Sequence, residues 1–232
     1  DLWEAAIAEE LESLREAGTW DVVEVPRGAK VFPSRFVLKV KRNSDGTLER
    51  RKARLVLLGN LQRPFVDFYD TYAPVADFVV VRIVLATACS KHWIVHQLDV
   101  KSAFLNGYID EEIYMQLPPE YARADGKVCK LKRSIYGLRQ APRAWNKRLC
   151  EDLKGSGFKA LVNAESVFYG VITGSVVYLI IYVDDILVAS SSETAVLTAK
   201  KSLRELYKIK DLGDAEYFLG VKIERERNCL KL

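Results

Sequence analysis

Two adjacent aspartates, Asp184 and Asp185, interrupt an otherwise apolar stretch of the sequence. The apolar run Val176 to Val183 leads directly into them, and the run Ile186 to Val188 follows at once. Two strands this close must be joined by a tight turn, and two like charges there are costly unless a cation neutralises them. A solvated turn is the alternative for an isolated Asp-Asp pair, although surface turns favour Asp-Gly or Asn-Gly.

A third aspartate, Asp99, has the same setting near the end of the apolar run Trp93 to Val100. If the two strands are neighbours in one sheet, Asp99 and Asp184 have Cβ atoms roughly 5 Å apart. Carboxylate oxygens are hard ligands that suit Mg²⁺. Two such ions about 3.5–4 Å apart can hold the attacking and leaving oxygens of an in-line phosphoryl transfer. The three aspartates therefore predict a two-metal site.

The composition of the 232-residue chain, with 49% hydrophobic and 28% charged residues, is typical of a soluble globular protein. Its longest apolar run has eight residues, which is too short for a transmembrane helix. The N-terminus has neither a basic region nor an apolar signal core. Because there is also no initiator Met, we expect the chain to be a segment of a longer protein.

The net charge of +4 is unevenly distributed along the chain. Residues 39–54 hold seven bases and two acids, and residues 127–150 hold eight bases and no acid. The bases of the first stretch recur with a period of two, at Lys39 and Lys41 and at Arg50, Lys52 and Arg54. Each set therefore lies on one face of its strand. Together the two stretches predict a polyanionic partner, and a solvated surface is the alternative for either one.

The four cysteines form no Cys-x-x-Cys pair, so free thiols in a reducing compartment are expected. A zinc site at Cys89, His92 and His96 is the alternative. It is disfavoured because His96 lies in a strand pattern, where this spacing does not place both histidines on one helical face.

The second half of the sequence alternates between strand and helix patterns. Helices are predicted over 78–90, 141–154 and 193–207, and strands over 93–100, 165–172, 175–183, 186–189 and 216–225. In the first half, strands over 36–42 and 47–58 form a hairpin through Asp45-Gly46. This order predicts an α+β fold in which a split β-α-β-β-α-β antiparallel sheet carries helices on one face.

Three runs of the sequence resemble motifs A, B and C of reverse transcriptases: HQLDVKSAFLNG (96–107), SIYGLRQAPRAW (134–145) and YVDD (182–185). With KARLV, YAPV and YFLG in the same order, the closer resemblance is to copia-type (pseudovirus) long-terminal-repeat retrotransposons. The resemblance implies the fingers and palm of a right-hand polymerase. Residues 1–74 and 107–140 would form the fingers and residues 75–106 and 141–232 the palm, with the thumb and RNase H outside this segment.

The resemblance also implies roles for residues around the acids. Asp99 and Asp184 match the two principal metal ligands, and Asp185 matches an auxiliary acid. Because adjacent strand residues point to opposite faces, we expect Asp184 and Asp185 to differ, with Tyr182 sharing the face of Asp184 and contacting the primer end. Phe104 matches the aromatic residue whose bulk excludes a 2′-hydroxyl, with a plain core role as the alternative.

Further matches concern the nucleotide. Lys52 and Arg54 resemble the fingers bases that hold the triphosphate, and Lys41 is a less certain third. The nucleotide and template would lie beside a segment that contains Gly137, Gln140 and Pro142. Either Lys208 or Lys210 could protonate the departing pyrophosphate. The residue Asn60 departs from the family pattern, which places an aromatic residue after Gly59.

The function implied is that of an RNA-directed DNA polymerase with two Mg²⁺ ions, Mn²⁺ being the alternative. Its partners would be an RNA or DNA template, a nucleic-acid primer, deoxynucleoside triphosphates and the remainder of the Pol polyprotein, with no membrane. The family implies a cytoplasmic location in a virus-like particle. Two alternatives remain: a decayed or domesticated copy that binds nucleic acid without synthesis, and a palm-fold nucleotide cyclase, which would not need the segment 134–148.

Overall fold

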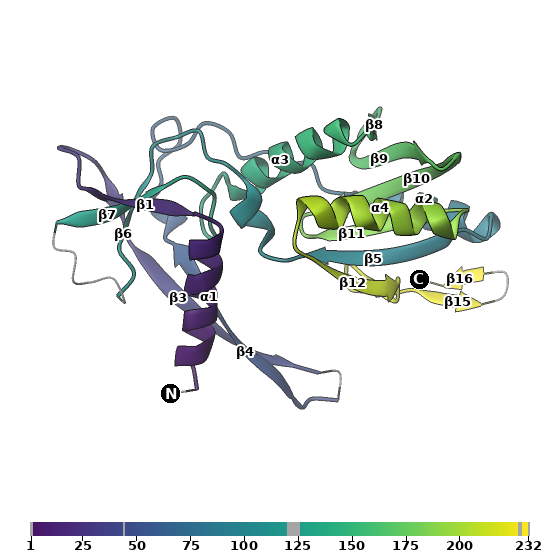
Figure 1. The fold of residues 1–232 in the computed structure, drawn as a ribbon, viewed down its shortest axis with the longest axis horizontal. Coiled ribbons are helices and arrows are strands. Elements are labelled where there is room, and N and C mark those ends of the chain that lie inside the picture. Colours follow the sequence, from purple (N-terminus) through teal and green to yellow (C-terminus); the bar gives the residue numbers. More distant parts are fainter. Residues whose placement is uncertain (1, 44, 120–125, 227–228, 232) are drawn as a thin grey trace. The chain divides into compact units, whose positions relative to one another are not determined.

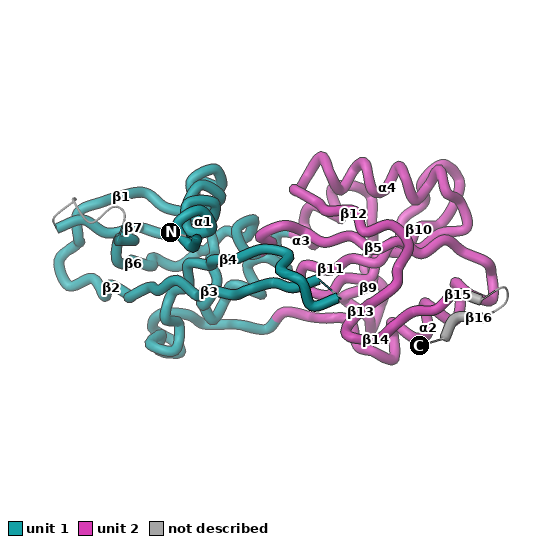
Figure 2. The backbone as a smooth tube through the Cα atoms, turned by 90° about the horizontal axis from the view of Figure 1, so that it is seen from below, with its two compact units in different colours: residues 1–72, 104–148 teal, residues 73–103, 149–232 magenta. Residues whose placement is uncertain are grey.

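The computed structural model describes residues 2–43, 45–119, 126–226 and 229–231. The chain divides into two compact units, residues 1–72 with 104–148 and residues 73–103 with 149–232 (Figure 2). These boundaries differ from those predicted in that residues 104–106 and 141–148 group with the first unit and residues 73–74 with the second. That the two units are the fingers and the palm stays a prediction.

The first unit contains a four-stranded sheet, a separate two-stranded hairpin, the helix α1 and the short helix η1. Their bounds are α1 Glu4–Glu16, β1 Trp20–Glu24, β2 Val31–Phe32, β3 Ser34–Arg42, β4 Leu48–Leu57, η1 Gly59–Leu61, β6 Tyr114–Gln116 and β7 Lys127–Leu131. The four strands lie in the order β1-β7-β6-β2, and β3 pairs with β4 (Figure 1). The short helix η2 (Ala103–Asn106) and the helix α3 (Ala141–Gly155) each cross the boundary between the units.

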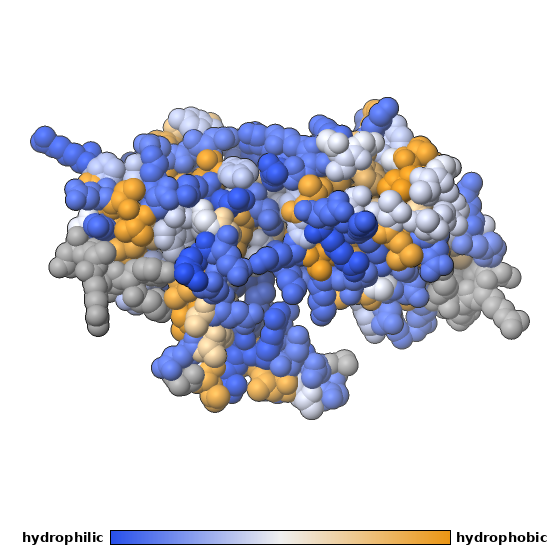
Figure 3. Space-filling model, in the orientation of Figure 1, coloured by the Kyte–Doolittle hydropathy of each residue, from blue (hydrophilic) through white to orange (hydrophobic). Residues whose placement is uncertain are grey.

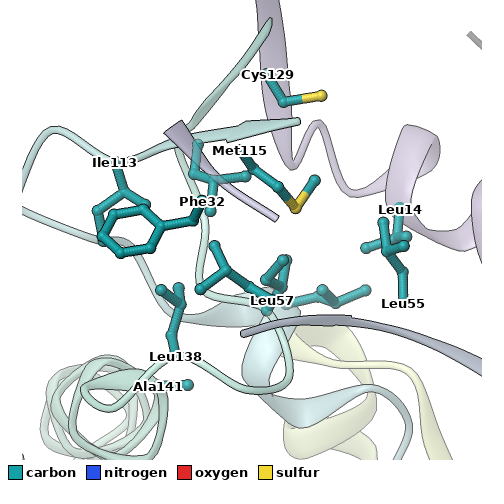
Figure 4. Close-up of a cluster of buried hydrophobic side chains, with 12 residues drawn as sticks. Leu14, Phe32, Leu55, Leu57, Ile113, Met115, Cys129, Leu138 and Ala141 are labelled. Atoms are coloured by element: carbon teal, nitrogen blue, oxygen red, sulfur yellow. The ribbon is translucent and has the colours of Figure 1, made fainter. Parts of the chain in front are cut away.

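The core of the first unit lies where α1, the hairpin and the four-stranded sheet meet (Figure 4). Leu14 of α1 is in one buried cluster with Leu55 and Leu57 of β4 and Met115 of β6. Burying each such side chain contributes about 1.5–3 kcal/mol. The cluster therefore fixes β4, which carries two of the predicted nucleotide-binding bases, against the rest of the unit.

The β3–β4 hairpin confirms the predicted pattern of charge. Its register places Lys39 opposite Lys52 and Lys41 opposite Arg50, so the two predicted rows of bases share one face. Ser44, in the predicted turn, lies outside the described residues. Beside it, Asp45 Oδ1 accepts a hydrogen bond from the Thr47 amide at 2.9 Å.

The second unit is built on a six-stranded antiparallel sheet. Its elements are α2 Phe78–Ser90, β5 Ile94–Val100, β8 Lys159–Leu161, β9 Ala164–Ile172, β10 Ser175–Tyr182, β11 Asp185–Ser190, α4 Glu193–Leu206 and β12 Ile209–Asp214. Short strands follow: β13 Tyr217–Phe218, β14 Val221–Lys222, β15 Glu224–Glu226 and β16 Cys229–Lys231. The sheet order is β12-β5-β11-β10-β9-β8. Within the chain, β5, α3, β10, β11, α4 and β12 follow one another as the split β-α-β-β-α-β arrangement predicted from the sequence, with β6 and β7 inserted before α3 and β8 and β9 inserted after it.

The last strand of this arrangement is β12, and the prediction of a strand over 216–225 is wrong. Residues 217–222 instead form the hairpin β13–β14, whose turn residues Leu219 and Gly220 both have positive φ, as a type I′ turn requires. In β12, half-buried and exposed residues alternate, which is typical of an edge strand. Its Asp211 accepts a hydrogen bond from the buried Lys200 of α4 at 2.9 Å, so α4 holds this edge in place.

The two faces of the sheet are covered by different helices. Val95 clusters with Leu85 and Val81 of α2, whereas the charge of Lys200 on α4 acts on the neighbouring residue His96. Successive strand residues point to opposite faces, so α4 covers one face and α2, which lies outside the split motif, packs on the other (Figure 1).

The apolar residues are largely gathered inside the two units, and Figure 3 shows a mostly hydrophilic face with small, separated apolar groups. Within the described residues, no helix combines the length and apolar character needed to cross a membrane. Cys89, Cys129 and Cys150 are free thiols, and burial raises the pKa of Cys129 to about 12. The side chain of Cys229 is not among those that the structure describes.

Candidate active site

The two adjacent aspartates lie at the tight turn between β10 and β11. Tyr182 pairs with Asp185, so Val183 and Asp184 are the two central residues of the turn. Val183 has φ +55°, as the first central position of a type II′ turn requires, although a β-branched residue rarely adopts it. The expected turn is therefore present one residue earlier than the Asp-Asp pair itself.

Asp99 meets this turn because β5 is the neighbour of β11. The register places Asp99 directly opposite Asp185, and the amide of Val100 donates a hydrogen bond to the carbonyl oxygen of Asp184 at 2.8 Å. The expected neighbourhood of the two strands is confirmed, but the residue paired with Asp99 is Asp185 rather than Asp184. Sheet pairing thus brings all three acids to one end of the sheet.

The expectation that Tyr182 shares the face of Asp184 is wrong. Tyr182 and Asp185 are directly opposite in the antiparallel pair and therefore share a face, which is also the face of Asp99. The alternation of faces holds along a strand, but Asp184 belongs to the turn, where the backbone leaves the pleat.

The three carboxylates repel one another in a partly desolvated site. Burial raises the pKa of Asp185 above its usual range, and the negative charges of Asp184 and Asp99 add to the effect. A hydrogen bond from Gln97 Nε2 to Asp185 Oδ1 at 3.1 Å acts in the opposite direction. Gln97 was not singled out from the sequence, although its position two residues before Asp99 on the same strand places it on the same face.

The donor types at this end of the sheet fit a divalent cation. Asp99, Asp184 and Asp185 supply only carboxylate oxygens, the ligands that Mg²⁺ prefers, and their mutual repulsion is what a cation would relieve. In the part of the chain that the structure describes, no three acidic, histidine or cysteine side chains are gathered around one point as they would be around a metal ion.

The residues of the disfavoured zinc site lie along the second unit. Cys89 is near the end of α2, His92 follows the helix with φ +53°, and His96 is in β5. The Nε2 atom of His96 lies 3.3 Å from Asp214 Oδ1. Burial lowers the pKa of His96, with a further contribution from the charge of Lys200.

Of the two lysines considered for the pyrophosphate, Lys210 is beside the acids. It stands directly opposite Asp99 in the pairing of β12 with β5. The carbonyl oxygen of Lys208 accepts a hydrogen bond from the amide of Lys101 at 2.9 Å, which fixes the start of this pairing. Lys210 is exposed and shares the face of Asp99.

In the first unit, Lys52 and Arg54 lie on the basic face of the hairpin. Burial lowers the pKa of Lys52, and the charges of Arg54, Lys41 and Arg50 lower it further. Such crowding of like charges indicates a surface that would gain from binding an anion. The guanidinium of Arg54 lies over the ring of Tyr136, with 4.3 Å from Cζ to the ring centroid.

The predicted segment 137–142 passes close to the end of β4. Gly137 has φ +94°, and a Cβ atom there would lie 2.0 Å from the carbonyl oxygen of Leu57. A Cβ atom on Gly59 would in turn lie 1.9 Å from the carbonyl oxygen of Gly137. Both glycines are therefore required by close backbone approach, and Pro142 lies in the first turn of α3 as predicted.

Gln140 is buried and bonded to protein groups. Its Oε1 accepts a hydrogen bond from Gln62 Nε2 at 3.1 Å, and its Nε2 donates to Glu111 Oε2 at 3.3 Å. Gln62 lies 78 residues away along the chain, and no local sequence pattern predicts this contact.

The two basic stretches are not equivalent in the structure. Within 127–150, four bases have acidic partners within 4.0 Å: Lys130 with Glu112, Lys132 with Asp21, Arg143 with Asp70 and Lys147 with Asp110. The last two pairs line a pocket beside Gln140, so the charges of that pocket are compensated within the protein. On the hairpin, Arg50 lies 3.9 Å from Glu49, and the charges of Lys52 and Arg54 act on Glu10 of α1, so the bases there are paired less closely than these four.

Comparison with known proteins agrees with this arrangement. Residues 17–232 match the family described as reverse transcriptase (RNA-dependent DNA polymerase), and the chain belongs to this family. It is 38% identical over 230 residues to the retrovirus-related Pol polyprotein from transposon TNT 1-94 of Nicotiana tabacum, which covers 98% of this chain. It is also 38% identical over 233 residues, or 99% of the chain, to that from transposon RE1 of Arabidopsis thaliana. The predicted family is thus confirmed.

The chain spans only 17% and 16% of the lengths of these two polyproteins. Among solved structures, it is similar to a foamy viral protease-reverse transcriptase in complex with double-stranded DNA, with a TM-score of 0.48 and 18% identity. That match covers 95% of this chain and 33% of the other.

Proposed function

We propose that this chain performs RNA-directed DNA synthesis as the polymerase segment of a copia-type retrotransposon Pol polyprotein. The primer 3′-hydroxyl oxygen attacks the α-phosphorus of a deoxynucleoside triphosphate, a new P–O bond forms, and the bond to pyrophosphate breaks. The observation that carries the proposal is the pairing of β5 with β11, which brings Asp99, Asp184 and Asp185 to one end of the sheet.

Asp99 and Asp184 are proposed to hold two Mg²⁺ ions, or Mn²⁺ in their place, with Asp185 as the auxiliary acid. When bound, such ions stabilise the negative charge that develops on the attacking and leaving oxygens. The raised pKa of Asp185 supports the assignment, because three half-buried carboxylates without a cation are electrostatically unfavourable. Lys210, opposite Asp99, is proposed to donate a proton to the departing pyrophosphate.

The substrate contacts are proposed from the motif positions. Lys52 and Arg54 bind the triphosphate, since their charges lie on the basic face of the hairpin. Phe104 excludes the 2′-hydroxyl of a ribonucleotide, and Tyr182 contacts the primer end. Three residues lie beside the nucleotide and template: Gly137, Gln140 and Pro142.

The proposed partners are an RNA or DNA template, a nucleic-acid primer, deoxynucleoside triphosphates and the remainder of the Pol polyprotein. The phosphate backbone would be held by the hairpin bases, which makes binding strongly dependent on salt. The family places such a protein in the cytoplasm, within a virus-like particle, and we propose that location here.

The test is primer extension on an RNA template with Mg²⁺, run with this chain and with a longer segment of the polyprotein. Asp184→Asn should abolish extension, whereas Asp214→Asn, on an exposed aspartate of β12, should retain it. Unchanged extension by Asp184→Asn would contradict the assignment of Asp184 as a metal ligand. Template binding without any extension by the wild-type protein would instead establish the alternative of a copy that binds nucleic acid without synthesis.

A further inference from the structure

Three side chains from separate segments of the first unit, Arg54, Tyr136 and Phe104, form a row in which each contacts the next. The Arg54 guanidinium lies over the face of Tyr136, and the ring of Phe104 meets Tyr136 edge-on, with centroids 5.0 Å apart and an interplanar angle of 68°. Both geometries are favourable for an aromatic ring, whose face is negative and whose edge is positive. Tyr136 is the only member of the three that touches both of the others in these contacts.

The guanidinium depends on the ring for its position. Arg54 Nε is buried and finds no hydrogen-bond partner among the residues that the structure describes. The aromatic face therefore orients the guanidinium, and a ring, unlike a carboxylate, does not neutralise its charge, which also acts on Glu10 of α1.

The backbone holds Tyr136 against both neighbours. Its carbonyl oxygen accepts a hydrogen bond from the Leu57 amide at 2.9 Å, three residues beyond Arg54 on β4. Two residues before Tyr136, the hydroxyl of Ser134 donates a hydrogen bond to the carbonyl oxygen of Phe104. The close packing of Gly137 on Leu57 leaves this segment no freedom to withdraw. The ring is thus pinned to β4 on one side and to the turn of Phe104 on the other.

We propose that Tyr136 is a positioning residue that couples the triphosphate-binding base Arg54 to the sugar-selecting residue Phe104. The inference rests on the function proposed above, in which Arg54 and Phe104 touch opposite ends of one nucleotide. A ring that fixes both sets the distance between the phosphate contact and the sugar contact. Loss of the ring should therefore weaken nucleotide binding and relax the discrimination between deoxyribose and ribose.

The experiment is single-nucleotide incorporation by the full chain on an RNA template and DNA primer, with kcat and KM measured for a deoxynucleotide and the matching ribonucleotide. Tyr136→Leu removes the aromatic face. It should raise KM for the deoxynucleotide roughly two- to thirty-fold, the equivalent of one cation–π contact. It should also lower the deoxynucleotide-to-ribonucleotide ratio of kcat/KM roughly two- to ten-fold, the equivalent of one aromatic pair.

Tyr136→Phe keeps the ring and should restore both values. Tyr108→Leu is the matched control, because it removes a similar contact in the same unit, with 4.5 Å from Arg133 Cζ to the ring centroid, and should leave the ratio unchanged. A merely structural loss of folded protein would lower both rates together and would not move the ratio. If thermal unfolding shows that Tyr136→Leu is not folded, Tyr136→Met gives the same comparison with a more adaptable side chain.

The proposal is overturned if a folded Tyr136→Leu or Tyr136→Met protein has the KM and the discrimination ratio of the wild type. A wild-type protein that incorporates no nucleotide at all contradicts the proposed function itself. An active wild type with an unaltered variant contradicts only the role of Tyr136, so the two failures are distinguishable.

Discussion

Asp99 and Asp185 stand directly opposite each other on β5 and β11, although 86 residues separate them in the sequence and both are half-buried. Like charges directly opposite in a sheet are destabilising. A protein that keeps such a pair at the end of a well-packed sheet loses stability there, and the loss is expected at sites where the charges serve a ligand.

Replacing Asp185 by Asn should stabilise the metal-free protein at neutral pH, by roughly 0.5–1 kcal/mol as for other partly exposed charge pairs. The pKa of Asp185 is raised in the folded state, so the folded protein binds a proton more readily than the unfolded chain. The contribution of Asp185 to stability is therefore most favourable at low pH and declines as the pH rises from the ordinary carboxyl range through its raised pKa. Asn removes this decline and can still accept the hydrogen bond from Gln97.

Urea unfolding between pH 4 and pH 7 in the presence of a chelator measures this effect. Asp214→Asn, whose side chain is 81% exposed, is the control and should change stability little. A less stable Asp185→Asn protein at pH 7 would show that the carboxylate makes a favourable interaction in the free protein.

Divalent metal should stabilise the wild-type protein, because a bound cation offsets the repulsion between these carboxylates. A ligand that binds only the folded state stabilises it by RT ln(1 + [L]/Kd), which is about 2.7 kcal/mol at a hundred times Kd. We expect Mg²⁺ or Mn²⁺ to raise the unfolding temperature of the wild type and of Asp214→Asn, and to have little effect on Asp99→Asn. Calorimetry measures these shifts in unfolding temperature. Equal shifts in all three proteins would show that the metal binds at a site that does not include Asp99.

The sequence anticipated those parts of the fold whose signals are local. The Asp45-Gly46 turn between alternating strands predicts the β3–β4 hairpin, and the apolar strands around Asp184 predict β10 and β11. The exact turn residues were missed because Val183, a β-branched residue, is a poor candidate for positive φ. The strand β12 was missed because Asp211 and Gly213 are typical of turns, and only the ion pair with Lys200 shows why they are ordered in a strand.

Charge compensation could not be predicted because its partners are distant in sequence. Lys132 lies 111 residues from Asp21, its partner at 2.6 Å, and nothing local to either residue indicates the pair. Counted along the chain, residues 127–150 are the more basic stretch, yet the folded protein neutralises several of these bases. The hydrogen bond between Gln62 and Gln140 escaped notice for the same reason.

This difference between the stretches predicts unequal effects on nucleic-acid binding. Lys41→Gln, on the basic face of the hairpin, should weaken binding to a template-primer at low salt and reduce the slope of log K against log salt by about 0.7–0.9. Lys132→Gln removes a base already paired with Asp21 and should change the slope less. Fluorescence anisotropy across a range of salt concentrations compares the two. A larger slope change for Lys132→Gln would indicate that the pair with Asp21 opens on binding.

The close approach of Gly137 to β4 predicts a severe effect of a single methyl group. In Gly137→Ala, the new Cβ atom would lie 2.0 Å from the carbonyl oxygen of Leu57, and φ +94° strains any residue with a side chain. We expect a loss of at least about 1–3 kcal/mol in the free energy of unfolding, because the backbone of Leu57 cannot shift without disturbing the buried cluster. Gly155→Ala is the matched control, since a Cβ atom at the end of α3 meets nothing within 4 Å, and this substitution should be neutral or slightly stabilising. Chemical unfolding measures the free energy of unfolding of both variants. Equal values would mean that the segment 134–142 is held less closely to β4 than the structure shows.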